Sequence, residues 1–351
     1  MKRTVILTVL GCLLLVACDQ SITYRNAPMN PLTDINPRLA FTCKHQIIPE
    51  ADADADADAD VLFNYARWLQ KNNLINRDKT VDVEIARLYR IAAENGHYKA
   101  SINLQNGALR GRFSLSSPER LRLSQQLIDA KIAAGYYFIA IYLEHGAAGL
   151  AQDPEMALRY YRKAADEGNP QAQAYIGEKL SPAKMAPQIA MQMLYCAAKQ
   201  GEGKAANSLG NMLAIEKKYP EAVEAFQLGV RAGDSGSAGF LGHGFAGPEP
   251  TDRLFYLALE KDSERARRYE QIGKVLAKYS WAHPTVPEIN DIVPLPPAPL
   301  PEWDGKLKWL EAWKAKVPPP KPSAALIAAL AKAKQLNPET GRPLPESPDF
   351  D

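Results

Sequence analysis

The chain has 351 residues, with 42 basic and 40 acidic side chains and a formal net charge of +2 at pH 7. A nucleic-acid-binding protein carries a basic face or stripe, so this near-neutral balance argues against nucleic acid as a partner. The length leaves room for about two domains.

The N-terminus has the pattern of an export signal. Lys2 and Arg3 precede an uncharged, leucine-rich stretch over residues 4–17, which is shorter than the roughly 20 apolar residues of a membrane-spanning helix. It ends in Leu-Val-Ala before Cys18, which resembles the lipobox of bacterial lipoproteins. The resemblance implies a signal peptide over residues 1–17, cleavage before Cys18 and a lipid anchor on that cysteine. An ordinary signal peptide with a chance cysteine is the alternative.

Asp19 bears on which membrane holds this anchor. An aspartate after the lipidated cysteine resembles the inner-membrane retention signal of enterobacterial lipoproteins. We therefore expect the periplasmic face of the inner membrane rather than the outer one. Cleavage after Ala17 would also leave 40 basic and 40 acidic residues, a formally neutral mature chain.

Residues 18–60 are interpreted as a lipidated tether and linker. Pro31, Pro37 and Pro49 interrupt the first part, and alanine alternates with aspartate from residue 51 to 60. Aspartates so close together repel one another and resist packing. A metal-binding acidic tract is the less favoured alternative, because spaced aspartates alone do not fix a coordination geometry.

Cys43 and Cys196 are the cysteines that remain, because Cys12 leaves with the signal and Cys18 carries lipid. An oxidising compartment permits a bridge between them. However, Cys196 falls in a helical repeat, where a free cysteine behaves as a small core residue. The pairing stays open, with the unpaired state favoured.

One pattern recurs over residues 61–247. Its clearest copy is Ala157-x3-Tyr161-x2-Ala164-Ala165-x2-Gly168, and further copies begin at Ile85, Ala190 and Ala222. A weaker copy ends at Gly135. The recurring glycines are spaced 39, 33, 33 and 32 residues apart: Gly96, Gly135, Gly168, Gly201 and Gly233.

The pattern predicts helical hairpins. Its large and small apolar residues lie on one helix face, and the glycine ends that helix because it adopts the left-handed conformation at little cost. A second helix follows, and its pairs Ile176-Gly177, Leu209-Gly210 and Leu241-Gly242 predict close helix crossings. A hairpin cannot bury its apolar face alone, so the units must stack.

The tract over residues 153–169 resembles the core of the Sel-like repeat, a relative of the tetratricopeptide repeat. The resemblance implies an all-α fold, a right-handed α-solenoid of helical hairpins. We expect a small helical domain with a proline-rich extended strap to follow it. A helical bundle without repeats is the alternative.

From residue 248 the period fails, and residues 248–316 are expected to form that C-terminal domain. One or two helices are predicted over residues 254–279, and a short helix over 306–316. The proline-rich stretch between them is extended. It is either a linker or an ordered strap whose Leu295, Leu300 and Trp303 pack back onto the helices; the apolar area of the tryptophans favours the strap. The tail, residues 317–351, is predicted to hold a helix over 323–336 and to be disordered beyond it.

Residues 254–305 also resemble an uncharacterised C-terminal domain that follows Sel-like repeats in bacterial lipoproteins. The resemblance rests on an Asp-x-Glu-Arg-x2-Arg-Tyr motif and on spaced prolines that lead to Trp-Asp-Gly. The candidate binding or strap residues are taken from these motifs: Asp262, Arg265, Arg268, Tyr269, Trp303 and Asp304.

We find no catalytic constellation in the sequence. The five histidines do not pair with a second ligand at metal-site spacing, and neither a nucleophile elbow nor a phosphate loop occurs. Charged residues near Asp262 share one helix, where they more often form ion pairs than acid–base pairs. No enzyme activity, cofactor or metal is therefore expected.

Lipobox, Sel-like repeats and this C-terminal domain together resemble immunity proteins of the type VI secretion system. The resemblance implies a periplasmic lipoprotein that binds and neutralises a co-encoded toxin stoichiometrically, often a phospholipase of the phospholipase D class. A scaffold or regulator of an envelope protein complex is the alternative, because a stacked helical array offers a large binding surface. A hydrolase of lipid or peptidoglycan is the least favoured function.

Overall fold

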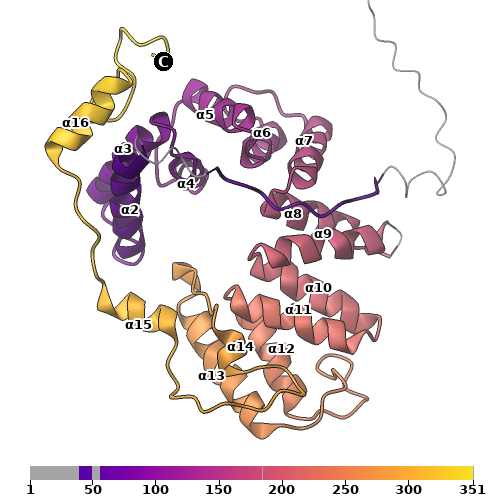
Figure 1. Cartoon of the computed structure of the whole chain (residues 1–351). Helices are drawn as coiled ribbons and strands as arrows, with labels where there is room; N and C mark the ends of the chain where they lie inside the picture. Colours follow the sequence, from indigo (N-terminus) through magenta and orange to yellow (C-terminus); the bar gives the residue numbers. More distant parts are fainter. Residues whose placement is uncertain (1–38, 50–55, 184, 351) are drawn as a thin grey trace, which may run out of the picture. The chain divides into compact units, whose positions relative to one another are not determined.

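A computed structural model describes residues 39–49, 56–183 and 185–350 of the chain. These described residues belong to one compact unit, residues 39–351. Their regular structure is built from helices arranged in hairpins (Figure 1), which confirms the all-α fold. No helix in this described part combines the length and apolar character needed to cross a membrane. The export signal, Cys18 and Asp19 lie outside the described residues.

The hairpins consist of a first and a second helix. The first helices are α3 (Lys79–Glu94), α5 (Ser117–Asp129), α7 (Pro154–Asp166), α9 (Pro187–Lys199) and α11 (Tyr219–Arg231). The second helices are α4 (Tyr98–Leu109), α6 (Ala134–His145), α8 (Pro170–Leu180), α10 (Gly203–Ile215) and α12 (Ser235–Phe245). Before them, α2 (Asp56–Asn72) packs on α3. After them come α13 (Ser263–Lys278), a 3-10 turn η1 (Ser280–Ala282), α14 (Ile289–Ile292), α15 (Lys308–Ala315) and α16 (Ala324–Ala333).

Glycines end four of the first helices, as the repeat pattern predicts. Their φ angles lie between 90° and 101°: Gly96, Gly168, Gly201 and Gly233. This left-handed conformation suits glycine and reverses the chain after the helix. In three hairpins the next side chain then accepts a hydrogen bond from the first turn of the second helix: His97, Asn169 and Asp234.

Gly135 does not end a first helix, unlike the other recurring glycines. It lies near the start of α6, where a Cβ atom would come within 2.6 Å of the carbonyl oxygen of Ser124. The left-handed position after α5 is occupied by Lys131, with a φ of 58°. The prediction therefore places the end of this first helix too far along the chain, because two alanines followed by a glycine resemble the pattern that ends the other first helices.

The hairpins stack through glycines of their second helices. A Cβ atom on Gly177 would lie 3.0 Å from Cγ of Leu194, and one on Gly210 would lie 2.6 Å from the ring of Phe226. Leu194 and Phe226 are the large residues of the following first helices. The Ile/Leu-Gly pairs thus mark close helix crossings, as predicted.

This stacking continues into α13. A Cβ atom on Gly242 would lie 3.6 Å from Cβ of Tyr269, so Tyr269 takes the place that Phe226 has one hairpin earlier. The packing of one helix on the next therefore extends beyond residue 247, the predicted end of the repeats. The irregular segment over residues 246–262 lengthens the interval between α12 and α13, so the spacing of the repeats is no longer visible in the sequence.

The proline-rich segment is an ordered strap rather than a linker. Leu295, Leu300 and Trp303 pack against the apolar core formed by α11, α12 and α13. The Arg265 guanidinium donates to the carbonyl of Pro294 at 3.2 Å. The strap is therefore held by apolar contacts along its length and by an arginine side chain that donates a hydrogen bond to one of its backbone carbonyls.

We expect Trp303→Ala to loosen this strap. Trp303 is half-buried, its ring centroid lies 5.8 Å from the Arg268 guanidinium carbon, and its indole nitrogen donates to the carbonyl of Lys306 at 2.9 Å. Losing these contacts should lower the free energy of unfolding by about 1–2 kcal/mol. Limited proteolysis should then cut residues 294–307 faster than in the wild type, and Leu254→Ala, at an exposed side chain, is the control. Equal protease resistance in Trp303→Ala would show that the ring does not hold the strap.

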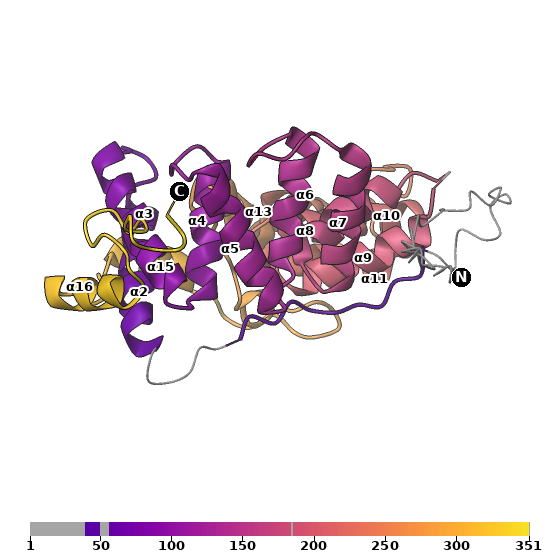
Figure 2. The ribbon, with the colours of Figure 1, turned by 90° about the horizontal axis from the view of Figure 1, so that it is seen from above.

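The C-terminal tail returns to the first hairpin. Ile327 and Ala331 of α16, with Leu336, share one apolar cluster with α2 and α3. Figures 1 and 2 show α16 beside these two helices. The Arg90 guanidinium donates to the carbonyl of Thr340 at 3.0 Å. The expected disorder beyond residue 336 is therefore wrong for the part that ends at residue 350: this polar, proline-containing segment is ordered by hydrogen bonds to α3 rather than by apolar burial.

Candidate binding surface

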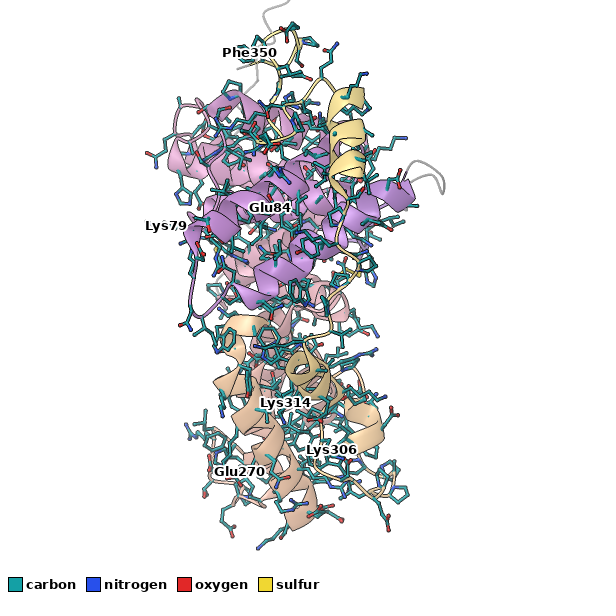
Figure 3. The ribbon with its side chains drawn as sticks, turned by 90° about the vertical axis from the view of Figure 1, so that its left-hand side faces the viewer. Lys79, Glu84, Glu270, Lys306, Lys314 and Phe350 are labelled. Atoms are coloured by element: carbon teal, nitrogen blue, oxygen red, sulfur yellow. A yellow bond between two sulfur atoms is a disulfide. The ribbon has the colours of Figure 1, made fainter. Side chains whose placement is uncertain are left out.

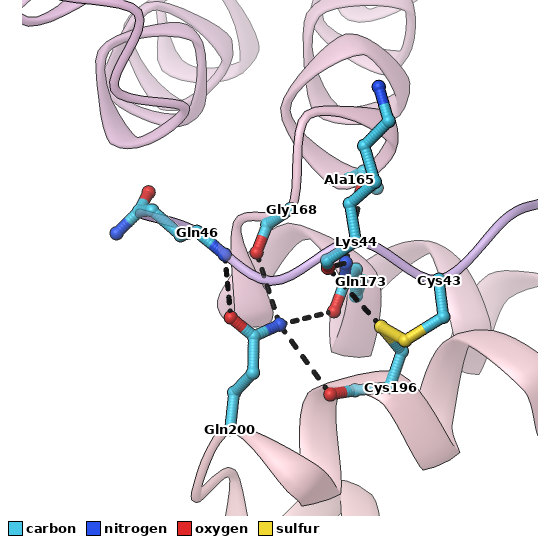
Figure 4. The surroundings of a disulfide bond; sticks show 8 residues. All are labelled: Cys43, Lys44, Gln46, Ala165, Gly168, Gln173, Cys196 and Gln200. Atoms are coloured by element: carbon cyan, nitrogen blue, oxygen red, sulfur yellow. Dashed lines mark hydrogen bonds between the residues drawn. A yellow bond between two sulfur atoms is a disulfide. The ribbon is translucent and has the colours of Figure 1, made fainter. Parts of the chain in front are cut away.

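The N-terminal segment, residues 39–49, is bound along the hairpins rather than free. Figures 2 and 4 show it beside α8 and α9, where a disulfide joins Cys43 to Cys196. The bond settles the open pairing, and the preference for unpaired cysteines was wrong. Cys196 does lie in the core, as its repeat position predicts, but it faces the segment that brings Cys43 to it. A disulfide agrees with an oxidising compartment outside the cytoplasm.

Glutamines of α8 and of the end of α9 hold the same segment by hydrogen bonds. The amide of Gln46 donates to Oε1 of Gln200 at 2.8 Å, and Nε2 of Gln173 donates to the carbonyl of Lys44 at 2.8 Å. Nε2 of Gln200 in turn donates to Gln173 at 2.9 Å and to the carbonyl of Gly168 at 3.1 Å (Figure 4). The tether predicted over residues 18–60 is therefore wrong for residues 39–49, and α2 begins at residue 56, inside the alanine–aspartate alternation.

Gly168 permits this segment to pass. Its φ is 101°, and a Cβ atom there would lie 2.6 Å from the carbonyl carbon of His45. Gly201 has a similar φ of 95° but open space around it. We expect Gly201→Ala to lower the free energy of unfolding by about 1 kcal/mol and Gly168→Ala to cost about 2–3 kcal/mol, because only the second adds a backbone clash to the conformational strain. Urea denaturation of both variants measures the difference; equal losses would contradict this contact.

Cys43, His45 and Cys196 have the spacing of a potential metal trio, with ligand atoms within 4.8 Å of one another. Both sulfur atoms belong to the disulfide, and a metal is bound by thiolate rather than by disulfide sulfur. The residues as paired here do not form a metal site.

A groove lies between the first helices α9 and α11, with a volume of about 510 Å³. Its floor is apolar and is made by side chains of α9, α10, α11 and the strap: Met191, Leu209, Leu213, Ala225, Leu228 and Leu295. Its rim carries side chains of both charges: Lys199, Lys218, Glu221, Glu224 and Arg231. An apolar centre inside a polar rim is the usual anatomy of a protein–protein interface.

Tyr195 is the most prominent side chain of this groove. It is 49% exposed, and Nζ of Lys199 lies 5.9 Å from its ring centroid. Tyrosine is enriched among the residues that dominate binding energy at protein interfaces. At the rim, a hydrogen bond to Glu216 raises the pKa of Lys218. The groove therefore offers an aromatic anchor, an apolar floor and fixed charges.

A tyrosine cluster on α6, α7 and α8 is a second aromatic surface. The hydroxyls of Tyr161 and Tyr175 each donate to Glu144 at 2.7 Å, and the two rings lie 4.2 Å apart. Burial, together with the hydrogen bond to Glu144, raises the pKa of Tyr175 to about 12. Because both hydroxyls bind the protein's own carboxylate, the cluster joins the three helices, and the groove is the better candidate for a partner.

The residues selected from the sequence lie at the junction of α13 and the strap. Asp262 caps α13 by accepting the amides of Glu264 and Arg265, and its carboxylate also pairs with the Arg265 side chain at 2.5 Å. Arg268 donates to the carbonyl of Ile292 at 2.7 Å. These side chains therefore hold the strap; they do not line the groove.

The other selected residues have similar structural partners. Tyr269 is buried and its hydroxyl donates to Gln227 at 2.7 Å. Asp304 is exposed and accepts the amide of Lys306 at 3.0 Å, which shapes the turn after Trp303. The structure thus places Arg268 beside the Trp303 ring, and that ring packs against the apolar cluster that contains Tyr269. Asp304 lies at the end of the strap.

The residues that line the groove were not among those predicted from the sequence. Tyr195 occupies the repeat position that holds Arg162 in α7 and Gln227 in α11. An exposed aromatic residue where other copies are polar is the signal that could have identified it. Leu295 was singled out for the strap, but its contribution to the groove depends on how the strap crosses α11, which the sequence does not show.

Comparison with solved structures finds three relatives from Pseudomonas aeruginosa. PA5086 is 27% identical with a TM-score of 0.52, over 74% of this chain and 96% of that protein. The immunity protein PA5088 is 26% identical with a TM-score of 0.55, over 74% of this chain and 95% of that protein. The immunity protein Pa5087 is 23% identical with a TM-score of 0.51 and shares the fold.

A family model described as a domain of unknown function (DUF6396) matches residues 237–344, which begin in α12 and include α13, the strap, α15 and α16. A search of curated proteins gives no match. The repeats, the stacking and these comparisons together identify the chain as a Sel1-like repeat helical protein that has a C-terminal DUF6396 domain and resembles Pseudomonas immunity proteins.

Proposed function

We propose that this protein is an immunity protein, which neutralises a secreted toxin by binding it. The observation that carries the proposal is the likeness to the immunity protein PA5088 over three quarters of the chain, at 26% identity and a TM-score of 0.55. A stacked helical array binds other proteins through its extended surface. The disulfide between Cys43 and Cys196 fits a protein that meets its toxin outside the cytoplasm.

The toxin that we propose is a phospholipase delivered by the type VI secretion system. This target class rests on the resemblance of the whole architecture, from the lipobox at Cys18 to the strap, to immunity lipoproteins of that system. A lipid anchor on the periplasmic face of the inner membrane would place the protein at the surface that a phospholipase attacks.

The groove between α9 and α11 is the surface that we propose for the toxin. An apolar side chain or helix of the toxin would bury itself against Met191, Leu213 and Leu228, and Tyr195 would close over it. The rim has lysine, arginine and glutamate side chains, which favour a partner with complementary charges. Binding of this kind blocks the toxin stoichiometrically and needs no chemistry from the protein.

Competition between siblings tests the proposal. A strain without the gene should be killed by toxin-producing siblings, and the wild-type gene should restore survival. The double variant Tyr195→Ala/Leu228→Ala should fail to restore it at equal protein level, because truncated central residues of an interface cost the most binding energy. Ile215→Ala is the matched control, since Ile215 is 82% exposed and does not line the groove. A deletion strain that stays resistant would overturn the proposed function.

A further inference from the structure

We propose that an aromatic patch around α15 docks on the surface of an anionic phospholipid membrane. The patch consists of Tyr279 and Trp281 after α13 and of Trp309 and Trp313 on α15. Ring centroids lie 5.8 Å apart for Tyr279 and Trp309, 5.5 Å for Trp281 and Trp313, and 5.4 Å for Trp309 and Trp313. The four rings therefore form one continuous aromatic surface.

The described protein leaves this patch accessible. Trp281 is 36% exposed, the other three rings are half-buried, and α15 has no buried residue. Val317, just beyond α15, is 76% exposed. A contiguous exposed aromatic surface of this kind marks an interaction site rather than a packing defect.

Lysines accompany the rings. Between Gly305 and Lys321 the chain has five lysines and a single acidic residue, Glu311. Figure 3 looks onto this side of the molecule, with Lys306 and Lys314 labelled. The patch is therefore both aromatic and cationic.

The lysines distinguish a membrane from a protein as the occupant. Tryptophan and tyrosine are common at both kinds of interface, but lysine is depleted from protein–protein interfaces. At a membrane, aromatic rings sit at headgroup level, and lysine stems extend so that the ammonium groups reach the phosphates. A negative leaflet attracts such basic segments. The composition thus favours phospholipid.

The membrane contact is independent of the toxin-binding groove. None of the four rings lines that groove, and the lipid contact does not depend on what the groove binds. A docked patch would add a second, non-covalent membrane contact on a folded part of the protein, in addition to any lipid at the N-terminus.

Quenching of tryptophan fluorescence by brominated lipid tests the inference. The full chain is mixed with vesicles of phosphatidylethanolamine and phosphatidylglycerol whose acyl chains carry bromine, which quenches only tryptophans that enter the interface. Trp281, Trp309 and Trp313 should be quenched. The triple variant Trp281→Phe/Trp309→Phe/Trp313→Phe should lose the quenching, whereas Trp68→Phe, on α2, should keep it.

Charge reversal provides the second variant and keeps every ring. Lys306→Glu/Lys308→Glu/Lys314→Glu/Lys316→Glu should lose the quenching. The wild-type chain should also lose it on vesicles of brominated phosphatidylcholine alone, which are uncharged. Unchanged quenching in the triple tryptophan variant would overturn the inference, because tryptophans outside the patch would then meet the lipid. Unchanged quenching after charge reversal would also overturn it, because the contact would not need the lysines. Unquenched patch tryptophans in the wild type would also overturn it, as would a protein partner that alone shields them without lipid.

Discussion

Replacing Glu119 with alanine should destabilise the protein by about 3–5 kcal/mol, because it leaves a buried guanidinium without its counter-charge. Glu119 on α5 pairs with Arg90 on α3, and the two side chains are only 3% and 4% exposed. The Arg90 guanidinium also donates to the carbonyls of Ser114 and Thr340, each at 3.0 Å. These neutral acceptors remain in the variant, but they do not neutralise the charge.

The shift of the urea midpoint measures this loss, and an exposed pair is the matched control. Glu155 and Arg159 form an ion pair in α7 with side chains 79% and 59% exposed, so Glu155→Ala should change stability by only a few tenths of a kcal/mol. The variant Arg90→Met/Glu119→Leu should regain most of the stability, since apolar side chains often replace a buried ion pair without loss. If Glu119→Ala were as mild as Glu155→Ala, the buried pair would not join the first two hairpins.

Replacing Phe226 with alanine should cost about 3–5 kcal/mol, the range for truncating a buried phenylalanine. Phe226 is fully buried, and its ring stacks on Phe240 with centroids 4.7 Å apart. On its other side lies Gly210, where a Cβ atom would come within 2.6 Å of the ring. The ring thus fills the joint between two stacked hairpins.

A second substitution makes this test specific. Gly210→Ala alone should destabilise the protein by about 1–3 kcal/mol, because it forces a methyl group into the Phe226 ring. In the Phe226→Ala background the same change should be neutral or stabilising, since the methyl group enters the cavity and alanine favours the helix by about 1 kcal/mol over glycine. Thermal melting of the wild type, the two single variants and the double variant gives the coupling free energy between positions 210 and 226. Additive effects would contradict a direct contact across the joint.

The repeat pattern predicts the fold well where its periodicity is dense. The left-handed glycines, such as Gly168 and Gly201, and the close crossings at Gly177 and Gly210 follow from residue size and spacing alone. The prediction fails where another residue takes the same backbone conformation, as Lys131 does in place of a glycine. It also fails at α13, because an irregular segment changes the spacing.

Long-range contacts explain what the sequence does not show. The N-terminal segment and the C-terminal tail lie outside the repeat pattern, and each is held by distant partners: Cys43 by Cys196, and Thr340 by Arg90. No local pattern encodes such a partner. The groove was not predicted for the same reason, since Tyr195 and Leu295 come from distant parts of the sequence and line one groove only in the folded chain.

Direct inhibition tests the central claim, that this protein neutralises a toxin by binding it. The purified protein is titrated into its proposed target, a secreted phospholipase toxin, and hydrolysis of phospholipid vesicles is followed. The account predicts that hydrolysis falls to zero at one equivalent of the wild-type protein or of Ile215→Ala. Tyr195→Ala/Leu228→Ala should need a large excess. Full hydrolysis in the presence of excess folded wild-type protein would contradict the account.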